Sequence, residues 1–132
     1  MEKNRNALVG FSGLIGATLQ AQADFSLRFR STNIKEITHR RFDTVVCAAA
    51  PAQKWKANSD PLSDRSNIAS LIDHLRTITC QQFILISTVD VFQDPVGVDE
   101  YSDVNEFRLH AYGRNRLTLE KFVERQFSEH LI

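Results

Sequence analysis

Short apolar runs alternate with amphipathic stretches along the whole chain. Four runs have the length and composition of strands, and a fifth begins at the last residues; they are 7–10, 25–30, 43–47, 83–86 and 130–132. Residues 25–30 alternate between apolar and polar, as a half-buried strand does. Residues 83–86 are all apolar, which is typical of a strand covered on both faces.

Segments with helical spacing of apolar residues lie between these runs. They are residues 14–23, 64–79 and 112–126. Thr32 and Asn33 can cap a further short helix ahead of the third strand. The segment that contains Pro51, Trp55 and Pro61 is expected to be a loop, and residues 93–110 predict a long irregular stretch. Loops of that length in compact domains tend to be functional.

Strands that alternate with helices predict an α/β domain of three layers. Right-handed crossovers between parallel strands favour a Rossmann-like sheet with the strand order 3-2-1-4-5, numbered along the chain. A domain seldom ends by entering an interior strand. We therefore expect residues 1–132 to form one domain of a longer protein, truncated at its C-terminus.

Composition narrows the class of protein. A chain of 132 residues, 42% hydrophobic and 24% charged, suits one globular domain. Sixteen basic residues balance sixteen acidic ones, so charge gives no reason to expect nucleic acid or a membrane surface as a partner. Two cysteines are too few for a disulfide framework or a zinc cluster, and no metal site is expected. No apolar run suits a membrane span or a signal peptide, which predicts a cytoplasmic protein.

Three of the five glycines fall where the first strand ends and a helix begins. This spacing allows a tight turn, a close approach of the backbone to a pyrophosphate, and binding of that pyrophosphate at the helix N-terminus. A structural glycine turn without a ligand is the alternative. The residues predicted to hold a dinucleotide here are Gly10, Phe11, Ser12, Gly13, Leu14, Ile15 and Gly16.

Two further strand ends carry residues suited to the same ligand. Arg30 can neutralise a 2′-phosphate on the adenine ribose and Ser31 can hydrogen-bond to it, which favours NADP over NAD; an ordinary exposed arginine is the alternative. Ala48, Ala49 and Ala50 follow the third strand, where small side chains let a flat ligand lie against the backbone, although alanines also fit a crowded junction. The dinucleotide is then expected across the carboxyl ends of the first and fourth strands.

A hydroxyl, a phenol and a cation form a third candidate group. Thr88 follows the fourth strand, and Tyr112 and Arg116 lie one helical turn apart on one face of the last helix. A positive neighbour favours the phenolate and brings a tyrosine closer to proton transfer at working pH. A surface tyrosine at a helix start is the alternative reading.

With these motifs in this order, the sequence resembles the extended short-chain dehydrogenase/reductase superfamily, in its NAD-dependent epimerase/dehydratase branch. The resemblance implies that Thr88 orients the substrate oxygen, that Tyr112 is the acid/base, and that Ser87 contacts the cofactor. It further implies that Asn67, early in a helix, supports a proton relay. Arg116 stands where the family has a lysine, and Val89-Asp90 stands where the dehydratases have Asp-Glu, which disfavours dehydration.

Two functions therefore remain open. One is the NAD(P)-binding part of an oxidoreductase, epimerase or reductase that acts on a small molecule such as a sugar nucleotide. The other is a non-catalytic NAD(P)-binding module with a structural or sensing role. A structural domain without a ligand is a weaker third. Because the family's substrate-binding region is absent from these 132 residues, we expect them alone to show little turnover. The apolar stripes of the last two helices suit either a homodimer interface or the domain's own core.

Overall fold

The fold is built on a parallel sheet of five strands. The computed structural model describes residues 4–51 and 53–132. The N-terminal segment, in which no signal peptide is expected, therefore lies partly outside the described residues. The strands are β1 (Ala7–Val9), β2 (Leu27–Phe29), β3 (Arg41–Cys47), β4 (Thr79–Leu85) and β5 (His130–Leu131). All four pairings are parallel, and the order across the sheet is β2-β1-β3-β4-β5.

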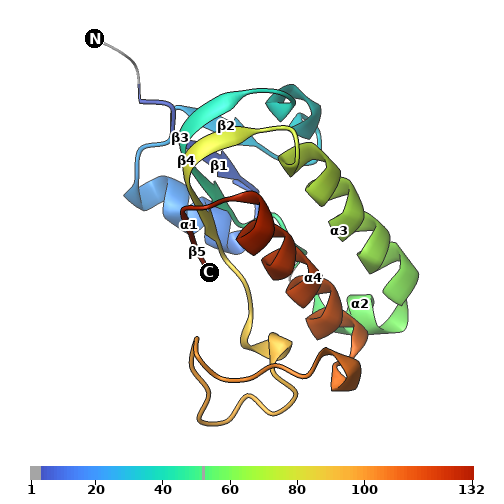
Figure 1. The fold of residues 1–132 in the computed structure, drawn as a ribbon. Coiled ribbons are helices and arrows are strands. Elements are labelled where there is room, and N and C mark those ends of the chain that lie inside the picture. The colour runs from blue at the N-terminus through green and yellow to red at the C-terminus, as the bar shows by residue number, and fades with distance from the viewer. Residues whose placement is uncertain (1–3, 52) are drawn as a thin grey trace.

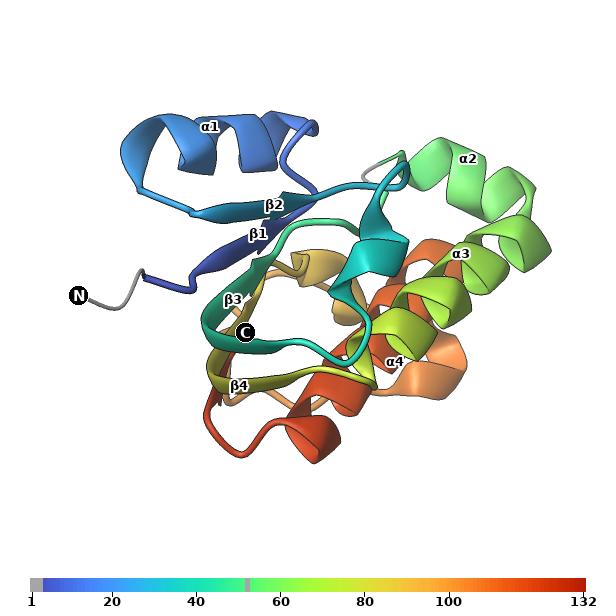
Figure 2. The same cartoon turned by 90° about the horizontal axis from the view of Figure 1, so that it is seen from above.

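Helices cover the two faces of this sheet unequally. Helix α1 (Leu14–Gln22) lies on one face, and α3 (Pro61–Leu75) and α4 (Ala111–Gln126) lie on the other (Figures 1 and 2). The short helix α2 (Lys54–Ser59) precedes α3, and three single turns of 3-10 helix occur at η1 (Ile34–Ile37), η2 (Val89–Val91) and η3 (Glu106–Arg108). The predicted three-layer α/β architecture is thereby confirmed. None of the described helices is long and apolar enough to cross a membrane.

The predicted strand order 3-2-1-4-5 is wrong in one respect. Strand β3 lies between β1 and β4, where the prediction placed it outside β2. Val45 and Cys47 are buried on the α3 and α4 side, and Val46 is buried on the α1 side. A strand with both faces buried belongs in the interior of a sheet. Strand β2 stands at the end of the strand order next to β1 and exposes Arg28, which suits an edge.

Two other differences concern the segment after β3. Residues 54–59, expected in a loop, form α2, and α3 begins at Pro61 rather than at residue 64. Asp60 caps α3 by accepting a hydrogen bond from the Ser63 backbone at 3.2 Å, and proline is favoured in a first helical turn. The long segment after β4 remains irregular up to η3, as predicted.

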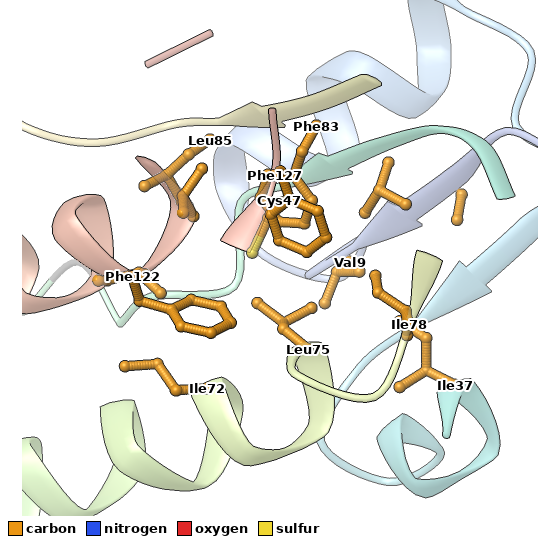
Figure 3. Packing of buried hydrophobic residues seen from close by; sticks show 14 of the residues in the cluster. Val9, Ile37, Cys47, Ile72, Leu75, Ile78, Phe83, Leu85, Phe122 and Phe127 are labelled. Atoms are coloured by element: carbon orange, nitrogen blue, oxygen red, sulfur yellow. The ribbon is translucent and has the colours of Figure 1, made fainter. Parts of the chain in front are cut away.

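The main core lies between the sheet and the pair α3 and α4 (Figure 3). Phe127, just after α4, stacks on Phe83 of β4 with ring centroids 4.3 Å apart. The apolar stripes of the last two helices are used here; their buried members are Ile68, Ile72, Leu75, Leu119, Phe122 and Val123. Cys47 is fully buried, and burial raises the pKa of its thiol to about 11, so it acts as a small apolar side chain.

Candidate functional site

A cavity of about 640 Å³ opens at the carboxyl ends of β1, β2 and β3. Its volume lies within the range of small-molecule sites. Most of the residues predicted to bind a dinucleotide meet here, although they come from three separate segments. The predicted dinucleotide-binding residues that line it are Gly10, Ser12, Gly13, Leu14, Ile15, Arg30, Ser31, Ala48, Ala49 and Ala50. Asn67 of α3, which the resemblance implied for a proton relay, lines it as well. Two α3 side chains that the sequence did not single out, Ser70 and His74, also line it.

The strand order moves the expected binding position. Strands β1 and β3 are neighbours. From β1 the chain continues to β2 on one side, and from β3 it continues to β4 on the other side. The topological switch therefore lies between β1 and β3. The cavity lies at that switch. The predicted switch point between the first and fourth strands was therefore wrong, because it rested on placing β3 at the far edge.

The glycines of the first loop have different roles. Gly10 has φ +90°, and a Cβ there would lie 2.5 Å from the Ala48 carbonyl oxygen; a Cβ at Gly16 would overlap the Gly10 carbonyl. Both positions need glycine because backbone approaches backbone. At Gly13 an added Cβ would meet only the Gly10 carbonyl oxygen, at 3.8 Å. Gly13 thus leaves space on the cavity side.

Helix α1 presents its first turn to the cavity. Gly13 is the N-cap residue and supplies no side-chain cap, and the first turn holds no acidic side chain. The first N–H groups of a helix have no partner within the helix and carry a partial positive charge. With Leu14 and Ile15 lining the cavity, this end of α1 is suited to an anionic group.

Charge in the cavity has one sign. Arg30 lines it, and none of the acidic residues that the structure describes does. Such a lining disfavours the carboxylate recognition of a ribose diol and favours phosphate.

Three of the residues predicted to bind the dinucleotide do not line the cavity. Gly16 is buried beneath the glycine loop, Phe11 packs against the core on the α1 side, and Ser87 lies beyond β4. Ser87 faces Glu120 of α4. Burial raises the pKa of the Glu120 carboxyl, a hydrogen bond from Ser87 lowers it, and the nearby charge of Glu124 raises it further.

Three of the predicted proton-transfer residues, Thr88, Tyr112 and Arg116, lie outside the cavity lining. The Thr88 hydroxyl lies 3.2 Å from Oδ2 of Asp90 and accepts a hydrogen bond from the Asp90 backbone at 3.2 Å. Tyr112 is 8% exposed, and its backbone N–H donates to the Asn58 side chain. Neither residue, nor Arg116, lines the described cavity.

Arg116 makes a buried ion pair that the sequence analysis did not anticipate. Its guanidinium donates to both carboxylate oxygens of Asp64 in α3, at 2.8 and 3.0 Å, and also to the carbonyl of Pro51. Arg116 is 3% exposed and Asp64 6% exposed. The guanidinium also lies over the face of the Tyr112 ring, 4.4 Å from its centroid. The cation next to the tyrosine is thus present, but its hydrogen bonds go to Asp64.

A second charged group lies beside Thr88. Lys54 of α2 pairs with Asp90 at 2.8 Å, and His110 approaches the same carboxylate at 3.8 Å. The Lys54 hydrogen bond holds the pKa of Asp90 below its ordinary value, against the opposing effect of burial. The contact between Lys54 and Asp90 was not predicted, because α2 was expected to be a loop and no local spacing relates the two residues.

No protein-family model and no curated protein sequence matches the chain, whereas solved structures do. One is the dTDP-4-dehydrorhamnose reductase of Bacillus anthracis in complex with NADP, with a TM-score of 0.71 and 19% identity over 98% of this chain and 52% of that one. Another is the UDP-Glc/GlcNAc 4-epimerase of Campylobacter jejuni, with a TM-score of 0.71 and 21% identity over 94% of this chain and 49% of that one. RMD from Pseudomonas aeruginosa, complexed with NADPH, has a TM-score of 0.67 and 18% identity over 92% of this chain and 48% of that one.

The chain spans about half the length of the solved structures that it matches. The structural similarity extends over nearly all of this chain, and at 19% and 21% sequence identity it shows a shared fold. The chain therefore shares the Rossmann-like fold of these reductases and epimerases, which belong to the extended short-chain dehydrogenase/reductase superfamily that its motifs resemble.

Proposed function

We propose that the chain binds a nicotinamide dinucleotide in the cavity at the ends of β1, β2 and β3. In this proposal it is the NAD(P)-binding part of an oxidoreductase or epimerase whose substrate is a small molecule of the sugar-nucleotide class. The single observation that carries the proposal is the convergence of the glycine loop, the Arg30-Ser31 pair and the alanine turn on one cavity. Structures of similar fold include a reductase in complex with NADP and an epimerase with bound NAD.

The lining supports this ligand in three ways. The uncapped start of α1 can bind a pyrophosphate, the small side chains of Ala48, Ala49 and Ala50 leave room for a flat ring, and Arg30 can bind a ribose phosphate. When bound, the dinucleotide would supply hydride transfer. In this proposal Ser87 contacts the cofactor and Asn67 supports a proton relay, as the family resemblance implies.

Replacing Gly13 with leucine should abolish dinucleotide binding and leave the fold intact. Gly13 has φ −77°, which any residue adopts, and an added Cβ meets no close neighbour. A leucine side chain there would occupy the space in front of the helix N-terminus. Titration calorimetry with NAD and NADP measures binding, and circular dichroism checks the fold. Ala17→Leu, which adds bulk to an exposed position of α1 outside the cavity lining, is the matched control. Binding by Gly13→Leu at wild-type affinity would contradict the site.

The wild-type chain should bind NADP more tightly than NAD by roughly ten- to a hundredfold, the value of a charge-assisted contact to a phosphate. Arg30→Ala should remove this preference. Arg28→Ala is the control, because Arg28 is an exposed arginine of β2, two residues before Arg30, and does not line the cavity. Equal affinities for the two dinucleotides in the wild type would make Arg30 an ordinary surface residue.

For catalysis, Tyr112 would transfer a proton and Thr88 would orient the substrate oxygen. The Arg116 guanidinium lies over the Tyr112 ring, 4.4 Å from its centroid, which holds the ring in place for this role. The Lys54–Asp90 ion pair lies beside Thr88, because Asp90 also contacts the Thr88 hydroxyl.

A second function, dinucleotide binding without catalysis, is favoured by one observation. The hydrogen bonds of Arg116 are committed to Asp64 and Pro51, so this residue is less free than a lysine would be to bind a nicotinamide ribose. Nicotinamide absorbance, followed with a panel of sugar nucleotides, separates the two functions. Turnover by the chain would support the enzyme, and cofactor binding without turnover, also in a version extended at the C-terminus, would support the binding module.

A further inference from the structure

The turn that follows β2 is held by hydrogen bonds on both sides of Arg30. The Asn33 side chain accepts from the Arg30 backbone N–H at 2.6 Å and donates to the Arg28 carbonyl at 3.0 Å. The Asn33 backbone N–H donates to the Arg30 carbonyl at 3.0 Å. These bonds fix the backbone from which the Arg30 side chain extends into the cavity.

The Arg30 side chain is also held, although it is exposed. Its Nε donates to the Thr32 hydroxyl at 3.0 Å, and its Cζ lies 5.8 Å from the centroid of the Phe11 ring, within the range of a cation–π contact. The two terminal nitrogens have no hydrogen-bond partner among the described residues, so both can donate to an incoming phosphate.

Phe11 can hold the guanidinium because its ring is itself fixed. The ring is half-buried and packs against the cluster of Leu8, Phe25 and Val46 on the α1 side of the sheet. The adjoining Gly10 N–H donates to the Phe29 carbonyl at 2.8 Å, which ties the glycine loop to the end of β2. The Phe11 ring therefore lies between the core and Arg30, and it is not part of the cavity lining.

We propose that Phe11 and Thr32 are positioning residues that orient Arg30 toward a phosphate on the adenosine ribose, and that they set a preference for the 2′-phosphorylated dinucleotide. The inference rests on the proposed function and adds a specificity device to the same site. An arginine loses side-chain entropy when it binds a phosphate, and two contacts that already restrict it reduce this loss. NAD carries a neutral hydroxyl at this position, so it gains less from the arrangement.

The test measures the ratio of NADP to NAD affinity by titration calorimetry in Phe11→Leu and Thr32→Val. Each variant should lower the ratio by about two- to fivefold, as the loss of one exposed contact to the arginine predicts. Phe11→Tyr and Thr32→Ser, which keep the ring face and the hydroxyl, should restore it. A general loss of structure lowers both affinities together, so the ratio isolates the positioning role.

A second ligand pair defines what the arginine binds. Adenosine 2′,5′-bisphosphate should show the same dependence on Phe11 and Thr32 relative to adenosine 5′-monophosphate, since the two differ only in the 2′-phosphate. A wild-type preference for NADP that stays unchanged in both Phe11→Leu and Thr32→Val would overturn this inference and leave the proposed function standing. Binding of neither dinucleotide by the wild-type chain would overturn both.

Discussion

Arg116→Met is expected to lower the free energy of unfolding by about 3–5 kcal/mol, the usual cost of removing one partner from a buried ion pair. The variant leaves the Asp64 carboxylate buried at 6% exposure, with the Asn115 amide as its one remaining partner among the described contacts, at 2.6 Å. It also removes the donor to the Pro51 carbonyl. Urea unfolding followed by circular dichroism measures the change.

Two further variants show whether the loss belongs to the pair. Arg125→Met, which removes an exposed arginine from the same helix, should stay within about 0.5 kcal/mol of the wild type. The double variant Arg116→Met/Asp64→Leu removes both charges and should be more stable than Arg116→Met by about 1–3 kcal/mol. A loss of less than 1 kcal/mol in the single variant would mean that the guanidinium is not needed between α3 and α4.

The same pair shows where local patterns stop being informative. Helical spacing was enough to place Tyr112 and Arg116 on one face, because neighbours one turn apart depend only on the helix itself. The partner of Arg116 could not be found this way, since Asp64 lies on another helix and is brought close by the packing of α3 against α4. Its burial therefore became visible only in the folded chain.

Most of the residues that line the cavity could be predicted from the sequence, whereas the strand order could not. Gly10 and Arg30 each end a predicted strand and Ala48 directly follows one, and the carboxyl ends of parallel strands share one edge of the sheet. Their convergence therefore holds for either order. The order itself depends on which strand edges pair, and the apolar run of β3 does not identify its neighbours. Helix α2 was missed for a related reason: Ala57 is its one buried residue, so it carries no apolar stripe.

Gly10→Ala is expected to lower the free energy of unfolding by about 2–5 kcal/mol. A side chain at φ +90° costs about 1–2 kcal/mol, and overpacking a filled site typically costs about 1–3 kcal/mol more. The overpacking is specific, because the new Cβ would lie 2.5–2.7 Å from backbone atoms of Ala48 and Ala49. Pushing this turn away from the glycine loop also displaces two walls of the cavity. Dinucleotide affinity should therefore fall in the fraction of protein that remains folded.

Gly97→Ala is the matched control, since it separates the backbone conformation from the close contact. Gly97 also has a positive φ, +65°, but an added Cβ there would meet nothing within 4 Å. It should cost only the strain, about 1–2 kcal/mol, and leave dinucleotide binding unchanged. Denaturant midpoints of the two variants, measured side by side, give the contribution of the approach between Gly10 and Ala48. Equal losses in the two would show that the alanine turn can move aside, and that β1 and β3 do not hold the glycine loop against it.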